Sequence, residues 1–391
     1  MISFDNTQIA FEYKSNKELR KAYWLFKLVG SPVLVKVGKW FTHFALKTHL
    51  PVKGIIKKTI FQQFCGGETI DECAQTTNKL AAYGVNTILD YSVEGQKSEK
   101  NFEATTKEII ATIEAAKNNA NIPLSVFKIS GVSRFDLLEK FNDESFEGSA
   151  QDHQDFTGVL DRVRRICQSA FEANVPVMID AEETWVQDTI DRLTMSMMSE
   201  FNREKAIVYN TLQMYRHDRL NHFKEELEKA KVHGFIYAVK VVRGAYMEKE
   251  RDRAEKMGYP SPINATKQDS DKLYDDVLRS ASMDIEHCAI VVGTHNEESS
   301  LLMTQLMKEH NIGSDDKRIY FAQLLGMSDH ISFNLSNAGY NVAKYVPYGP
   351  VREVLPYLIR RAEENTSAAG QTSRELRLIL KEKARRKSAK Q

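Results

Sequence analysis

Eight short runs of β-branched and aromatic residues limit the fold of this chain more than any other feature. Segments with helical spacing of apolar residues separate the runs, and several end in Gly or Asn, which commonly follow helices. Strands that alternate with helices predict βα units and a parallel sheet. The runs cover residues 85–92, 123–130, 175–183, 206–213, 234–244, 288–296, 318–326 and 341–349.

The number of runs favours a (βα)8 barrel of the TIM type, which has eight strands and about 250 residues. The competing fold is an open, doubly wound sheet, which normally has fewer strands and binds dinucleotides through G-x-G-x-x-G. The chain contains neither that motif nor the phosphate-binding G-x-x-x-x-G-K-[ST]. We therefore expect an α/β protein built on a (βα)8 barrel.

Changes in residue pattern and charge along the sequence divide the chain into three parts. We expect a helical arm over residues 1–80, a catalytic barrel over 81–371 and a basic helical tail over 372–391. The tail carries eight Lys or Arg residues against two Glu residues, and the region 31–60 is also basic and apolar. Basic amphipathic helices can lie on anionic lipid. A frayed, solvated helix is the alternative for the tail.

Composition excludes several classes of protein. Lys plus Arg number 54 and Asp plus Glu number 53, so no global field favours nucleic acid. No apolar run reaches the roughly 18 residues of a membrane span, and we expect neither a secretory signal nor a transit peptide. The four cysteines include no C-x-x-C pair, which favours reduced thiols and no metal site. We expect a cytoplasmic protein that can contact the inner face of a membrane peripherally.

Polar and charged residues stand at the carboxyl ends of the predicted strands. In a (βα)8 barrel these ends surround the active site. One such residue alone is as often a solvated loop residue. Together they predict a site, because unpaired charges are costly once desolvated. The residues are Asp90, Tyr91, Lys128, Asp180, Gln213, Lys240, Arg243, Thr294, His295, Gln323 and Tyr345.

The segment VREVLPYLIRRAEEN predicts a final helix with Pro356 in its first turn. Tyr357, Arg360, Arg361 and Glu364 then share one helical face. Two adjacent guanidinium groups suit a carboxylate or a phosphate, and Glu364 can hold both in place. The alternative is a solvated charged face. The aromatic ring on the same face argues against it.

Several motifs together resemble the proline dehydrogenases, most closely the monofunctional type of mitochondria and many bacteria. They are VKVVRGAYMEKER, DAEE, THN, FAQLLGM and YVPYGPVREVLPYLIRRAEEN, and the resemblance covers about residues 85–371. It implies a distorted (βα)8 barrel that binds FAD without a Rossmann fold. It also implies that the last helix lies over the barrel mouth.

The resemblance implies that L-proline is the substrate. Two arginines and a lysine would hold its carboxylate, and apolar or aromatic side chains would pack against its ring. These residues are Arg360, Arg361 and Lys128 for the carboxylate, Tyr345, Tyr357 and Leu324 for the ring, and Tyr246 for another side of the pocket.

The resemblance also assigns the catalytic and cofactor residues. Asp180 would lie near the substrate amine, where it can orient the amine or help to remove its proton. Alternatively, Asp180 has a structural role and pairs with Lys128 or an arginine. Lys240 would hydrogen-bond to the flavin near N5, although many bifunctional relatives have Arg there. The expected FAD-binding residues are Ile179, Gln213, Lys240, Val242, Arg243, Gly244, Ala245, Thr294 and His295.

The implied reaction is oxidation of L-proline to Δ1-pyrroline-5-carboxylate, the first step of proline catabolism. A hydride would pass to flavin N5 and electrons onward to a membrane quinone. Tyr345 favours proline over hydroxyproline, whose oxidising relatives have a smaller residue there. The sequence also leaves open a hydroxyproline dehydrogenase, a methylenetetrahydrofolate reductase, a barrel that forms a Schiff base on Lys128, and an inactive membrane adaptor.

Overall fold

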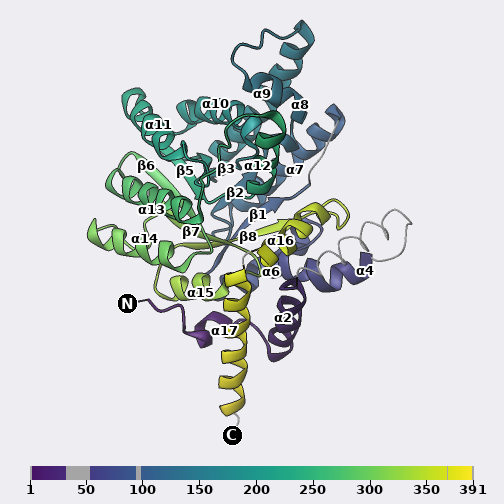
Figure 1. Cartoon of the computed structure of the whole chain (residues 1–391), viewed down its shortest axis with the longest axis vertical. Helices are drawn as coiled ribbons and strands as arrows, with labels where there is room; N and C mark the ends of the chain where they lie inside the picture. Colours follow the sequence, from purple (N-terminus) through teal and green to yellow (C-terminus); the bar gives the residue numbers. More distant parts are fainter. Residues whose placement is uncertain (1, 32–52, 94–97, 368, 390–391) are drawn as a thin grey trace. The chain divides into compact units, whose positions relative to one another are not determined.

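Eight parallel strands close into a barrel in sequence order, which confirms the predicted fold class (Figure 1). The computed structural model describes residues 2–31, 53–93, 98–367 and 369–389, without the side chains of 29, 53, 55 and 362–373. Each of the eight predicted runs contains one strand. The strands are β1 (Asn86–Tyr91), β2 (Leu124–Phe127), β3 (Val177–Ile179), β4 (Val208–Gln213), β5 (Tyr237–Val242), β6 (Cys288–Gly293), β7 (Ile319–Leu324) and β8 (Val342–Tyr348).

The chain forms two compact units, Met1–Glu94 with Gln323–Gln391, and Gly95–Ala322. In the second unit, the buried strands β4, β5 and β6 form its centre, and helices follow the strands along the chain. These helices are α7 (Glu99–Lys117), the 3₁₀ turn η2 (Ile129–Gly131), α8 (Phe135–Asn142), α9 (Ala150–Ala173), α10 (Thr184–Phe201), α11 (Arg219–His233), α12 (Met247–Met257), α13 (Lys267–Met283) and α14 (Glu297–Glu309).

Local sequence explains where several of these helices begin and end. Ser149 and Asp152 form a capping box at the start of α9, as Thr266 and Asp269 do for α13. Gly234 ends α11 in the left-handed conformation, which glycine adopts at little cost.

In the first unit, β1 and β8 pair in parallel with a continuous register from Asn86↔Ala343 to Tyr91↔Tyr348. The helices of the unit come from both ends of the chain. They are α1 (Thr7–Phe11), α2 (Asn16–Val29), α4 (Lys53–Ile56), the π-helix η1 (Lys57–Phe61), α5 (Gln62–Phe64), α6 (Ile70–Ala81), α15 (Asp329–Asn337), α16 (Leu355–Ser367) and α17 (Ala369–Ser388).

The basic tail is the packed helix α17 and not a frayed one. Leu378 and Ile379 are 1% exposed and join an apolar cluster with Phe11 and Phe26 of the N-terminal helices. Arg386 donates hydrogen bonds to the backbone oxygens of Phe11 and Lys14 at 2.7 and 2.8 Å. The described helices include none with the length and apolarity needed to cross a membrane.

Substitution tests whether α17 belongs to the core. We expect Leu378→Ala to lower the free energy of unfolding by about 2–5 kcal/mol, because it opens a cavity in a packed cluster. The matched control is Leu380→Ala, since Leu380 is 49% exposed. It should cost less than about 0.5 kcal/mol. Urea unfolding measures both, and equal small effects would show that the tail contributes nothing to the core.

Candidate active site

A buried ion pair joins the predicted catalytic residues Asp180 and Lys240. Lys240 lies on β5 and is 4% exposed, and its ammonium donates a hydrogen bond to Oδ1 of Asp180. Asp180 directly follows β3, where its backbone N–H donates to the oxygen of Phe127 at 2.9 Å. The structure therefore gives Asp180 a partner, Lys240, that local sequence did not indicate.

A second carboxyl group, Glu182, lies beside these residues and was missed as a site residue, although it is part of the DAEE motif. It is 4% exposed. The N–H of Ser130 donates to its Oε1 at 3.0 Å, and the hydroxyl of Ser130 donates to Oε2. Gln213 at the end of β4 donates from Nε2 to the backbone oxygen of Glu182 at 2.7 Å. Gln213 and the residues after β3 are thus held together.

Glu182 can titrate near neutral pH. Burial raises the pKa of this carboxyl to about 7, against the lowering effects of the Lys128 ammonium and the two hydrogen bonds from Ser130. Lys128, predicted to bind a carboxylate, therefore lies in the field of an acid whose charge changes near pH 7.

Arg243, after β5, is held in a fixed plane by three hydrogen bonds. Nε donates to Asp271 at 2.6 Å, Nη1 to Thr294 at 2.8 Å and Nη2 to Ser299 at 3.0 Å. The guanidinium also stacks on the ring of Tyr274, 4.4 Å from its centroid. This network joins the predicted residues Arg243 and Thr294. Nothing in the local sequence distinguished Asp271 or Ser299.

The backbone after Arg243 is open to solvent. Gly244 and Ala245 are exposed, and Tyr246, which precedes α12, is half-buried. Gly244 has φ of 123°, and a Cβ there would lie 2.6 Å from the ring of Tyr215. Only glycine fits this position without displacing that ring.

The other predicted cofactor residues line the same strand ends. Ile179 is fully buried, and its backbone oxygen accepts a hydrogen bond from Thr211 at 2.8 Å. Val242 and His295 are half-buried. Val242 accepts from the N–H of Met214 at 2.8 Å.

Tyr357, Arg360 and Arg361 lie on α16 in the unit that contains both chain ends. The guanidinium of Arg361 lies 5.2 Å from the centroid of the Tyr357 ring. Arg361 is only 8% exposed and Tyr357 is 6% exposed, so this is not a solvated charged face. Arg360 is half-buried. The side chain of Glu364, predicted to hold both arginines, lies outside the described residues.

Leu324 and Tyr345 belong to the same unit as α16. Leu324, at the end of β7, packs against an apolar cluster that includes Tyr357, Leu358 and Met327. Tyr345 on β8 is 7% exposed, and its backbone oxygen accepts from the N–H of Leu325 at 2.9 Å. Tyr357 is a member of this cluster and Leu324 packs against it, so the structure brings the two residues together.

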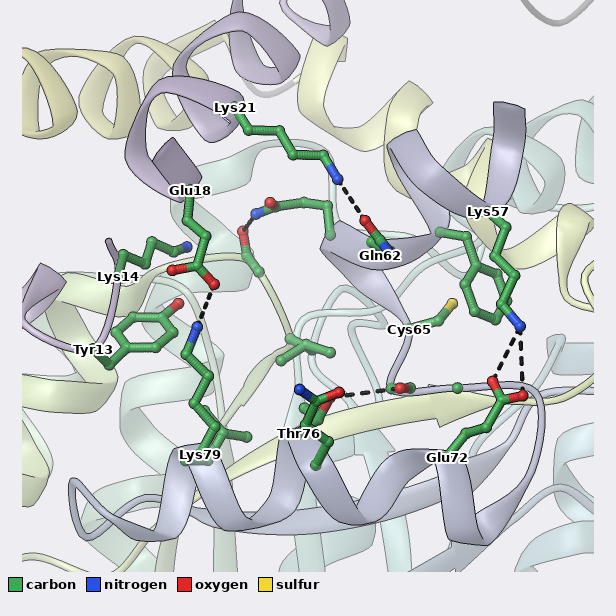
Figure 2. Close-up of a pocket in the computed structure, with 18 of the residues that line it drawn as sticks. Tyr13, Lys14, Glu18, Lys21, Lys57, Gln62, Cys65, Glu72, Thr76 and Lys79 are labelled. Atoms are coloured by element: carbon green, nitrogen blue, oxygen red, sulfur yellow. Dashed lines mark hydrogen bonds and ion pairs between the residues drawn. The ribbon is translucent and has the colours of Figure 1, made fainter. Parts of the chain in front are cut away.

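A cavity of about 700 Å³ in this unit is separate from the predicted residues (Figure 2). None of the described residues that line it is a predicted site residue. Several of its charged groups have partners within the protein: Lys79 with Glu18, Lys57 with Glu72, and Lys21 with the amide oxygen of Gln62. We assign no function to it.

Comparison with known proteins identifies the family. The family model described as proline dehydrogenase matches residues 73–374. The chain is 33% identical to proline dehydrogenase 1, mitochondrial, of Dictyostelium discoideum, over 98% of this chain and 74% of that protein. The chain belongs to the proline dehydrogenase family.

Other members of the proline dehydrogenase family agree with this assignment. Human proline dehydrogenase 1, mitochondrial, is 41% identical over 64% of this chain and 41% of its own length. The predicted family and enzyme class, an oxidoreductase, are confirmed. The solved structure of proline utilization A from Bdellovibrio bacteriovorus, inactivated by N-propargylglycine, matches with a TM-score of 0.72 and 21% identity. The match covers 92% of this chain and 38% of the chain of that structure, and it supports the barrel fold alone.

The pKa of Glu182 predicts a pH-dependent stability. Its folded-state pKa of about 7 exceeds the ordinary 4.5, so its contribution is fully present below about pH 4.5 and is lost as pH rises through about 7. The wild type should lose stability relative to Glu182→Gln between pH 5 and 8, by on the order of 3 kcal/mol. Denaturant unfolding of both proteins at each pH measures this. Parallel pH profiles would show that Glu182 does not titrate in this range.

Proposed function

We propose that this protein oxidises L-proline to Δ1-pyrroline-5-carboxylate with FAD as its cofactor, the first step of proline catabolism. The observation that carries the proposal is the buried Arg361 on the ring of Tyr357, in a chain of the proline dehydrogenase family. A forked cation beside an aromatic ring matches a small cyclic substrate with one carboxylate.

The residues predicted to hold FAD have a chemistry that fits it. The accessible backbone at Gly244 and Ala245, where a Cβ on Gly244 would strike Tyr215, allows close approach of a ligand to the main chain. Arg243 and Thr294 would face the ribityl and phosphate groups, with Gln213, Val242, Ile179 and His295 around the rest of the cofactor. When bound, FAD supplies a hydride acceptor at N5 for the hydrogen of proline C5.

Asp180 and Lys240 would act on the two sides of the reacting bond. A protonated amine is a poor hydride donor, so the proline nitrogen must lose its proton or be oriented by an acceptor. The carboxylate of Asp180 is that acceptor in our proposal. Its ion pair with Lys240 fixes the direction of the carboxylate, and the Lys240 ammonium would hydrogen-bond near flavin N5.

The substrate residues have separate roles in the proposal. Arg360, Arg361 and Lys128 bind the carboxylate. Leu324, Tyr345 and Tyr357 contact the ring, which excludes water from it, and Tyr246 closes another side. Glu182 acts on Lys128: above about pH 7 its charge would compete with the substrate for this ammonium.

Electrons would pass to a membrane quinone, with peripheral contact between protein and membrane. Residues 32–52, most of the first predicted contact segment, lie outside the described residues. In the second, the buried face of α17 belongs to the core and Lys381 donates a hydrogen bond to the backbone oxygen of Asp5, so the exposed Lys387 would face anionic lipid.

The arginine assignment predicts a specific kinetic defect. Arg361→Ala should raise the KM for L-proline by roughly 10–100-fold while FAD stays bound, because a charge-assisted hydrogen bond is lost. The matched control is Arg352→Ala, since Arg352 is exposed just before α16. Steady-state kinetics with a flavin absorbance check measures both. An unchanged KM for the Arg361 variant would refute the carboxylate assignment.

The side chain of Tyr345 predicts a preference for proline over hydroxyproline. A phenol ring that is 7% exposed leaves little room for an added hydroxyl group. Tyr345→Ser should therefore raise kcat/KM for hydroxyproline relative to proline by roughly tenfold. The ratio is measured on one preparation with both substrates. If the ratio does not move, Tyr345 does not exclude hydroxyproline by size.

A further inference from the structure

A buried cluster of charges lies behind the turn that follows β7, among residues that the proposed reaction does not use. Lys14 and Lys344 both pair with Asp329, at 2.8 Å to Oδ2 and 3.1 Å to Oδ1. The hydroxyl of Tyr13 donates to the same carboxylate at 2.6 Å. Lys344 is fully buried and Asp329 is 3% exposed. The N-terminal segment, the start of α15 and β8 therefore meet at one carboxylate.

Burying these charged groups costs free energy, so interactions between them must compensate for the loss of water. Burial lowers the pKa of Lys344, and the nearby Asp329 opposes that effect. Burial alone would raise the pKa of Asp329, but the ammonium groups of Lys14 and Lys344 lower it below its ordinary range. A buried ion pair often adds no net stability compared with apolar residues of equal volume. Such a pair then contributes more by fixing the geometry of its residues than by stabilising the fold.

Lys344 differs from Lys14 in what else it holds. Its ammonium donates to the backbone oxygen of Met327 and, at 3.4 Å, to that of Leu324. These two carbonyl groups belong to the turn between β7 and α15. Lys344 thus bridges the turn and the carboxylate, whereas Lys14 donates to the carboxylate of Asp329.

The same turn has an unusual backbone that side chains from other segments also support. Gly326 and Ser328 have φ of 76° and 50°. Nε2 of Gln63 donates to the oxygen of Gly326 at 2.9 Å, and Glu375 of α17 accepts from the N–H of Ser328. A left-handed serine is strained, so the surroundings must determine this conformation.

The turn also packs against the helix that carries the arginines. Met327 belongs to the apolar cluster that contains Tyr357 and Leu358 of α16, and Leu324 packs against that cluster. A shift of the turn would therefore move Leu324 and change the packing under Tyr357. Both are substrate residues in the proposed function.

We propose that Lys344 is a positioning residue for proline binding: it holds the Leu324–Met327 carbonyl groups, and through them the Leu324 and Tyr357 side of the substrate pocket. This inference rests on the proposed function. It differs from the direct assignments, because Lys344 acts through the turn and not by contact with the substrate.

The test compares two buried lysines on one carboxylate. Lys344→Met and Lys14→Met each leave Asp329 with one ammonium partner, but only the first removes the donor to the turn. Flavin-loaded Lys344→Met should show a KM for L-proline raised about tenfold with kcat within twofold. Its Kd for cyclopentanecarboxylate, which keeps the ring and the carboxylate but cannot be oxidised at nitrogen, should rise by the same factor in calorimetry. Lys14→Met should keep both values within twofold.

Three other outcomes would overturn the positioning role of Lys344. An unchanged KM in Lys344→Met, or equal changes in both variants, overturns the positioning role. If Lys344→Met does not fold, Gln63→Ala removes the bond to Gly326 in the same turn and should raise KM about threefold; no rise overturns the inference. A flavin-loaded wild type that does not oxidise proline overturns the proposed function instead, and this assignment with it.

Discussion

The parallel pairing of β1 with β8 is the constraint on which the rest of this structure depends. Parallel neighbours need crossover connections, and the connection between the first and last strands is the whole chain between them. Their register runs without a break over six residue pairs, Asn86↔Ala343 to Tyr91↔Tyr348. Closure leaves no free strand edge, and in parallel barrels of this kind active sites are built from the residues that follow the strands.

Charged side chains at these strand ends are held by one another. Lys240 with Asp180 and Arg243 with Asp271 are partly buried ion pairs. Each partner offsets part of the desolvation cost of the other, and each pair fixes the direction of its charged groups. Such pairs suit a site that must present charges to a substrate without rearrangement.

Local pattern was sufficient to predict the strands and the arginine helix. Each β-branched run contains a strand, because alternation and helix spacing depend only on neighbouring residues. The helix with Tyr357 and Arg361 was predictable for the same reason. The strand that follows residue 175 is much shorter than its run and covers only Val177–Ile179. Asp180, the next residue, pairs with Lys240, which the local pattern could not indicate.

Partners that depend on the tertiary fold were not predictable. Lys14 and Asp329 are 315 positions apart, and no local signal connects them. The burial that raises the pKa of Glu182 and the packing of Leu378 against N-terminal helices are likewise properties of the folded chain. The resemblance to proline dehydrogenases supplied roles for residues but not these supports.

The most direct test of the proposed function is the flavin spectrum of the purified protein under anaerobic titration with L-proline. We expect a bound flavin whose absorbance near 450 nm is bleached stoichiometrically by L-proline, since the proposed reaction ends with a two-electron reduction of the cofactor. A colourless protein that borohydride traps as a covalent adduct with its substrate would contradict this function, as would a bound flavin that L-proline does not reduce.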